Sequence, residues 1–228
     1  ANVCLLNTVS TQRMLLGGLP NPGMDFDLLR LRRAGLPTDT PTQDAASEAY
    51  GYHEALVTSG CQYRVINEYG LDHIDVADLV IVPDQRYLEV AIIDRLRAFV
   101  EAGGRLLITG QSALFDANGA RSASSPLLNL SGVTHVGASG HAHCYVTFAE
   151  PTLADGLSDR RLLVTAPSQR VELMSGTKVL ATAVFPEAET AREHFFFHRV
   201  VPPRRDAAPV AFLTHRAVEI DQLLHFAF

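Results

Sequence analysis

The sequence predicts a doubly wound α/β sandwich with a β-rich C-terminal part. In the first 110 residues, short apolar runs that suit β-strands alternate with segments of helical period. The runs at 78–84 and 105–110 are apolar almost throughout, as expected of parallel strands that are covered on both faces. Strands joined by crossover helices favour a parallel sheet between two helical layers.

The first predicted element is a strand at residues 2–9, an apolar and β-rich run. The segment that follows, 10–43, contains four prolines and no sustained period. We therefore expect a long irregular insertion there, in which residues 26–35 form at most a short helix.

Two helices and three strands complete the predicted core. A helix is expected over 44–59, followed by strands at 62–69 and 78–84. A second helix over 88–103 then leads into the strand at 105–110. Its apolar face consists of Leu88, Ile92, Leu96, Phe99 and Val100.

The pattern of apolar residues in the sequence changes after about residue 130. Short β-rich runs separated by turns replace the helical periods, which indicates antiparallel strands that extend or flank the sheet. No low-complexity linker separates the halves, so we predict one domain, with a doubly wound core at 1–125 and a β-rich extension at 126–228. The chain begins within a strand and without an initiator methionine, and we expect it to be part of a longer protein.

The composition of the chain argues against several classes of function. The chain has 228 residues and a formal net charge of −6, without the basic face of a nucleic-acid-binding protein. No apolar run approaches the roughly 18 residues of a membrane helix. Three cysteines without a CxxC spacing indicate thiols in a reducing compartment, and we expect a cytoplasmic protein. The absence of P-loop, GxGxxG and HExxH motifs leads us to expect no cofactor.

The turn after the strand at 105–110 has part of the pattern of a nucleophile elbow, a tight strand-to-helix turn that exposes a catalytic side chain. In the amidotransferase version this pattern is G-x-C-x-G, whereas residues 110–114 read GQSAL. Ser112, with Gln111 beside it, is a weak candidate for a nucleophile, because no His–acid partner is recognisable. We interpret Ser112 as a polar turn residue that bonds local amides.

Two aspartates extend this candidate site. Asp84 ends the strand at 78–84, at the carboxyl edge where open α/β sheets bind ligands, and Asp116 lies just beyond the turn. Together with Gln111 and Ser112 they could line a ligand pocket. The alternative is that both aspartates cap turns or helices.

His141 and His143 are a weak candidate for a metal site. In a strand they would point to the same face, whereas Cys144 would face the other way, and no further ligand is evident. We therefore expect no metal and interpret the pair as exposed strand histidines. Residues 194–198, HFFFH, are predicted to form a core strand whose polar face meets solvent or a partner.

Residues 45–120 resemble the trimerisation domain of family 42-type β-galactosidases and related glycoside hydrolases. The resemblance rests on three stretches and on the acidic, glycine-containing turn that follows them: ALVTSG, DLVIVPD and FVEAGGRLLITG. It implies a class I glutamine amidotransferase-like fold without the catalytic cysteine. That fold is a flavodoxin-like three-layer α/β/α sandwich.

The resemblance also implies a non-catalytic companion of a TIM-barrel domain, which would supply the two carboxylates for glycoside cleavage. The chain is too short to hold a barrel of about 250 residues as well. The implied partners are other copies of the chain, with a trimer favoured, or the barrel of the same polypeptide. Two alternatives stay open: a stand-alone amidotransferase-like hydrolase that uses Ser112, and a module that binds a sugar or another small molecule.

Overall fold

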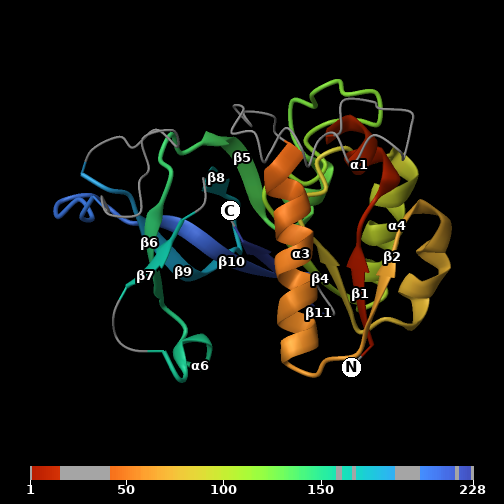
Figure 1. Cartoon of the computed structure of the whole chain (residues 1–228), viewed down its shortest axis with the longest axis horizontal. Coiled ribbons are helices and arrows are strands. Elements are labelled where there is room, and N and C mark those ends of the chain that lie inside the picture. Colours follow the sequence, from red (N-terminus) through yellow and green to blue (C-terminus); the bar gives the residue numbers. More distant parts are fainter. Residues whose placement is uncertain are drawn as a thin grey trace, which may run out of the picture.

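A nine-stranded sheet runs through the molecule in the order β2-β1-β3-β4-β11-β10-β9-β6-β7 (Figure 1). The computed structural model describes residues 2–15, 42–157, 161–165, 168–187, 201–218 and 221–226. The parallel half of the sheet consists of β2 (Tyr63–Ile66), β1 (Val3–Leu6), β3 (Leu79–Val82), β4 (Arg105–Thr109) and β11 (Asp221–Phe226).

The other half of the sheet is antiparallel, and we call its four strands the ribbon. It consists of β10 (Val210–Val218), β9 (Lys178–Val184), β6 (Cys144–Phe148) and β7 (Leu162–Val164). Two further strands, β5 (Val133–Ala138) and β8 (Gln169–Leu173), pair antiparallel in a separate small sheet. The predicted change from a parallel core to antiparallel strands is confirmed.

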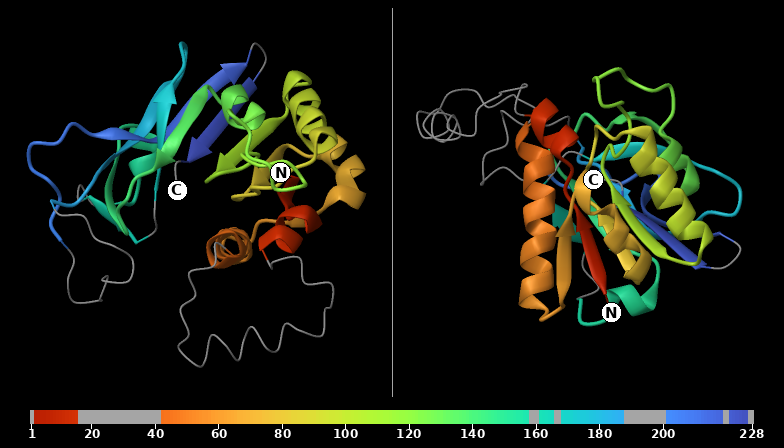
Figure 2. Two further views of the ribbon diagram at one scale, coloured as in Figure 1. Left: turned by 90° about the horizontal axis from the view of Figure 1, so that it is seen from above. Right: turned by 90° about the vertical axis from the view of Figure 1, so that its right-hand side faces the viewer.

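Helices cover both faces of the parallel half (Figure 2). α3 (Thr42–Thr58) packs on one face. The opposite face is covered by α4 (Val90–Glu101), α5 (Pro126–Leu130) and the 3-10 helix η2 (Glu68–Val76). Two short helices, α1 (Val9–Leu15) and α6 (Pro151–Ala154), complete the described elements. No helix in the described residues is long and apolar enough to span a membrane.

Alternate residues of each parallel strand face opposite helical layers. Leu6, Val80 and Ile108 are fully buried in the core shared with α4, α5 and η2. Their neighbours Leu5 and Ile81 pack instead in the smaller cluster beneath α3. This two-sided burial explains why the strand sequences are apolar throughout, and it confirms the predicted α/β layering.

The segment after β1 is helical from its first residues, where the sequence predicts an irregular insertion. The reason is a cap from a distant residue: the Glu68 carboxylate accepts hydrogen bonds from the Val9 amide at 2.9 Å and the Ser10 amide at 2.8 Å. Because these amides have no partner within the helix, the carboxylate stabilises the start of α1. The short helix predicted over 26–35 lies outside the described residues.

The strand predicted at 62–69 is shorter in the structure. β2 ends at Ile66, because the Asn67 side chain accepts a hydrogen bond from the Tyr69 amide at 3.0 Å and begins η2. The predicted strand had extended through Glu68, whose side chain instead caps α1.

Candidate active site

The first residue of the turn after β4 is a glycine. Gly110 has a φ of 60°, in the left-handed region, and a Cβ atom there would overlap the Asp84 carboxylate. In a nucleophile elbow the strained position lifts a reactive side chain clear of the backbone. Here the left-handed residues of the turn are Gly110 and Ala113, and Asp84 fills the space that a side chain at Gly110 would take. Ser112, at the nucleophile position of the pattern, is fully buried.

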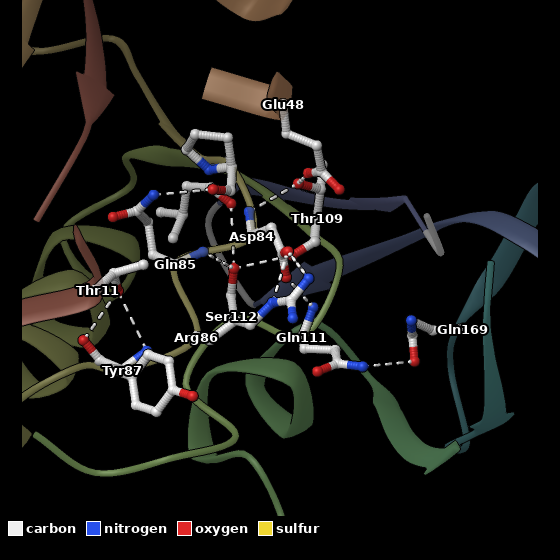
Figure 3. Close-up of polar contacts among 12 residues, drawn as sticks. Thr11, Glu48, Asp84, Gln85, Arg86, Tyr87, Thr109, Gln111, Ser112 and Gln169 are labelled. Atoms are coloured by element: carbon white, nitrogen blue, oxygen red, sulfur yellow. Dashed lines mark hydrogen bonds and ion pairs between the residues drawn. The ribbon is translucent and has the colours of Figure 1, made fainter. Parts of the chain in front are cut away.

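Ser112 lies beneath the turn and has no exposed surface. Its hydroxyl donates to the Thr109 carbonyl at 2.8 Å and accepts from the Gln85 amide at 3.0 Å (Figure 3). A second carbonyl, that of Val82, lies 3.3 Å from the same oxygen. Backbone groups therefore use both the donor and the acceptor capacity of the hydroxyl, and its partners are those of a structural turn residue.

The side chain of Asp84 joins the turns after β3 and β4. It is 2% exposed, and its Oδ1 accepts a hydrogen bond from the Gln111 amide at 2.7 Å. Its Oδ2 forms an ion pair with Arg86, with distances of 2.6 Å to a terminal guanidinium nitrogen and 2.8 Å to Nε. Both guanidinium nitrogens thus donate to the same oxygen, and such charge-assisted hydrogen bonds are stronger than those between neutral groups. The carboxylate thus has internal partners on both oxygens.

Gln85 fills the position where sheets of this type bind ligands. The chain order of the strands reverses between β1 and β3, and ligands of open α/β sheets bind in the crevice at such a point. The Gln85 side chain is 1% exposed, and its Oε1 accepts from the Thr8 amide at 2.7 Å and the Thr8 hydroxyl at 3.0 Å. Its Nε2 donates to the Pro83 carbonyl at 2.9 Å. The crevice is therefore occupied by a hydrogen-bonded side chain of the protein itself.

Thr109 connects this network to α3. Its hydroxyl accepts from the Asp84 amide at 3.1 Å and donates to the Glu48 carboxylate. Glu48 in turn contributes to raising the pKa of Tyr52, although burial is the larger cause. The hydrogen bond between Thr109 and Glu48 therefore connects the carboxyl edge of the sheet to α3, which covers one face of it.

Gln111 links the edge of the sheet to the small β5–β8 sheet. Its side-chain nitrogen Nε2 donates to Gln169 Oε1 at 3.2 Å, and the ring nitrogen Nε2 of His135 lies 2.9 Å from the same oxygen. Of the four predicted ligand-binding residues, Asp84, Gln111 and Ser112 are brought together (Figure 3).

Asp116 has a separate role from these three residues. Its Oδ1 accepts hydrogen bonds from the Asn118 and Ala120 amides, both at 2.9 Å, within its own turn. This is the turn-capping arrangement that the sequence analysis left as the alternative to a ligand site.

The histidine pair does not lie in a strand, and the interpretation as exposed strand histidines is wrong. Both residues precede β6, and His143 has no exposed surface. Its Nε2 lies 3.2 Å from the Val201 carbonyl, and its ring meets Tyr145 edge-on at 5.7 Å. His141 stacks on Phe185 at 4.9 Å, so the two rings have different neighbours. The predicted strand at 194–198 lies outside the described residues.

Cys144 directly follows His143 in the sequence and is buried in the core of the ribbon. Burial raises the pKa of its thiol to about 11, against the opposing effect of a hydrogen bond with Ser168. A thiol of this kind stays protonated at neutral pH, whereas metal coordination needs the thiolate. Within the described ranges, no group of three or more His, Cys, Asp or Glu residues could hold a metal ion.

Several residues that shape this edge were missed from the sequence. Gln85 directly follows the predicted Asp84, so its place after a buried strand was a usable signal. Thr8, Glu48 and Glu68 carried no comparable signal, because each acts on a segment far away in the chain.

The trimerisation domain of β-galactosidases matches this chain over residues 32–140. This segment is similar to that domain. It contains α3 and α4 and the residues Asp84, Gln85, Thr109, Gln111 and Ser112, whereas their partners Thr8 and Gln169 lie outside it. No curated protein sequence matches the chain.

Solved glycoside hydrolases share the fold of the whole chain. The β-galactosidase from Rahnella sp. R3 is 20% identical with a TM-score of 0.64, and that from Bacillus circulans sp. alkalophilus is 16% identical with a TM-score of 0.66. The α-L-fucosidase isoenzyme 2 from Paenibacillus thiaminolyticus is 16% identical with a TM-score of 0.65. Each match covers 100% of this chain but only 28%, 28% and 29% of the respective enzyme. The chain thus spans less than a third of the length of these enzymes.

Proposed function

We propose that this chain is a non-catalytic assembly part of a β-galactosidase-like glycoside hydrolase. The observation that carries the proposal is the trimerisation-domain match over 32–140, in a chain that aligns along its whole length with less than a third of solved β-galactosidases. The larger remainder of such an enzyme has room for a catalytic barrel with its two carboxylates.

The geometry of the carboxyl edge supports this proposal. The Ser112 hydroxyl is buried among backbone partners, and Gln85 occupies the crevice in which a ligand would lie. Asp84 and Asp116 hold turns through hydrogen bonds to backbone amides. These contacts favour a structural role for the edge over a hydrolase that uses Ser112 or a module that binds a sugar there.

We infer that the partners are other copies of the chain, with a trimer favoured, or a catalytic barrel of the same polypeptide. The described part of the chain has free cysteines at positions 4, 61 and 144, which supports a reducing, cytoplasmic location. No cofactor enters this proposal.

We further infer a flavodoxin-like, amidotransferase-like core. The parallel strands have the order β2-β1-β3-β4, which is the beginning of the flavodoxin-like order. The extension at 126–228 returns its last strand, β11, to pair with β4 of the core at 1–125. This pairing supports one domain, because neither part completes the sheet alone.

The experiment that tests the function measures turnover and mass on the same preparation. We expect the isolated chain to release no product from aryl β-galactosides and from the corresponding α-fucosides. Light scattering at micromolar concentration is expected to give a multiple of 24.8 kDa. Hydrolysis that one Asp→Asn or Glu→Gln substitution abolishes would contradict the non-catalytic role.

A further inference from the structure

The side of α3 that faces away from the sheet carries exposed apolar side chains. Tyr50 is 60% exposed and Val57 is 57% exposed, and their spacing of seven residues places them on one side of the helix, two turns apart. Tyr52 and Leu56, on the other side, pack against the sheet. The outer stripe therefore contributes nothing to the core beneath α3.

Aromatic rings continue this stripe from α3 to the edge strand β2. The Tyr50 ring lies 5.9 Å from that of His53, which lies 5.8 Å from the ring of Tyr63 on β2 and hydrogen-bonds its hydroxyl. Val65, two residues further along β2 and thus on the same face as Tyr63, is 55% exposed. These five residues form what we call the α3 surface, and tyrosine-rich, sparsely charged patches are typical of the centre of protein interfaces.

The charge of α3 indicates which kind of partner can bind to the α3 surface. Glu54 is exposed on this helix, whereas the Glu48 carboxylate is hydrogen-bonded to Thr109, and the sequence of α3 contains no lysine or arginine. Two such helices placed face to face would oppose like charges, which disfavours a symmetric α3–α3 contact. A partner for this surface therefore needs apolar groups accompanied by arginine or lysine.

The same chain presents such a surface at the end of the ribbon. Arg204 and Arg205 are adjacent and exposed in the segment that precedes β10, next to Pro202 and Pro203. This blue segment lies at the ribbon end of the molecule, well away from α3 (Figure 1). One copy thus carries an apolar surface beside the exposed carboxylate of Glu54 at one place. At another it carries a proline-containing segment with two exposed arginines followed by the exposed Asp206.

We propose that the α3 surface binds the Arg204–Arg205 segment of a second copy of this chain. The proposal rests on the assembly function above and identifies the contact through which it acts. A ring of three copies requires a head-to-tail contact between two different surfaces, because a symmetric contact closes with two. The whole α3 surface also lies inside the matched trimerisation segment 32–140.

Charge reversal on each side of the contact tests this proposal. Glu54→Arg changes the helix, and Arg205→Glu changes the ribbon; both side chains are exposed, so the fold is retained. We expect each single change to raise the dissociation constant of self-association at least about tenfold, and the double variant to restore much of the loss. Sedimentation velocity over a range of concentrations of the full chain measures both effects.

A second pair of variants tests the apolar part of the surface. Val57→Arg places a charge on the α3 surface and is expected to yield a monomer. Val90→Arg makes the same change at a valine that is 69% exposed on α4, on the opposite face of the sheet, and is expected to leave the mass unchanged. Thermal unfolding followed by circular dichroism checks that each variant is folded.

The possible outcomes distinguish a failure of the proposed contact from a failure of the proposed assembly function. If the unsubstituted chain self-associates but Glu54→Arg and Val57→Arg associate equally well, the assigned surface is wrong and the assembly function stands. The same conclusion follows if the double charge reversal restores nothing. If the unsubstituted chain stays monomeric at every concentration, self-assembly by this chain is refuted together with the contact.

Discussion

The carboxylate of Asp84 accepts a hydrogen bond from the backbone amide of Gln111 at 2.7 Å, which joins the turn after β3 to the turn after β4. The turns follow neighbouring parallel strands, so the bond spans the carboxyl edge of the sheet. It can form only because Gly110 leaves room for the carboxylate. An edge that binds ligands in other open α/β sheets is here closed by its own side chains.

Asp84→Ala is expected to reduce the free energy of unfolding by about 3–5 kcal/mol, because it leaves the guanidinium of Arg86 without its carboxylate in a largely buried position. Urea unfolding measures the loss. The control is Asp94→Ala, which removes an exposed ion pair with Arg97 and should cost less than about 1 kcal/mol. Equal losses in the two variants would show that Asp84 contributes no more than a surface charge.

Two glycines with similar backbone angles should respond differently to alanine. Gly110 has a φ of 60° and Gly140 a φ of 76°, but a Cβ meets the Asp84 carboxylate only at Gly110. We expect Gly140→Ala to cost about 1 kcal/mol, for the left-handed backbone alone. Gly110→Ala adds the displacement of Asp84 and should cost roughly 2–4 kcal/mol. The difference between the urea unfolding midpoints of the two variants shows whether the close approach of Asp84 to Gly110 adds to the loss of stability.

A fluorophosphonate probe should not label Ser112, because its hydroxyl is fully buried and hydrogen-bonded to the backbone. An active serine hydrolase in the same sample serves as the positive control. Ser112→Ala should instead lower stability by about 1–3 kcal/mol, since the Gln85 amide loses its acceptor. Stoichiometric labelling that disappears in Ser112→Ala would falsify the structural assignment.

Stability should fall in acid partly through Glu68. Burial on its own would raise the pKa of this carboxyl group, but the hydrogen bonds from Ser10 and Val9 outweigh it and hold the pKa below its ordinary value of 4.5. A carboxyl group with a lowered pKa stabilises the fold fully above the unfolded value. Its contribution is lost as the pH falls through the folded value.

Glu68→Gln should therefore be less stable than the unsubstituted chain at neutral pH, with a difference that shrinks as the pH falls below 4.5. Unfolding in urea at a series of pH values measures this convergence. Glu101→Gln, at an exposed position at the end of α4, is the matched control and should change the free energy of unfolding by less than about 0.5 kcal/mol. A difference that stays constant across the acid range would contradict a capping role for the charged form.

The helices and the strands of the core could be predicted because their signals are local. The apolar face of α4 and the apolar run of β3 are visible within a dozen residues, and burial on both faces explains them. The start of α1 could not be predicted, because the carboxylate that caps it belongs to Glu68, 59 positions from Val9. The same holds for the contact between Thr109 and Glu48, which are 61 positions apart.

At the candidate site, the sequence indicated where the turn lies but not what its side chains do. The departure from G-x-C-x-G at residues 112 and 114 correctly marked an unusual elbow. The filling of the crevice by Gln85 depends on Thr8, at the end of another strand, and spacing along the chain does not encode that distance. His143 was misplaced for a related reason, since it was read as part of a strand that begins one residue later.

The position of β11 between β4 and β10 has a consequence for how the chain is made. Residues 221–226 join the parallel half of the sheet to the ribbon, so a growing chain cannot connect the two before this strand has left the ribosome. Until that strand emerges, β4 and β10 each expose an unpaired edge that is open to pairing with other chains. Completion of the sheet therefore waits for β11, and a chaperone that shields those edges would act before it.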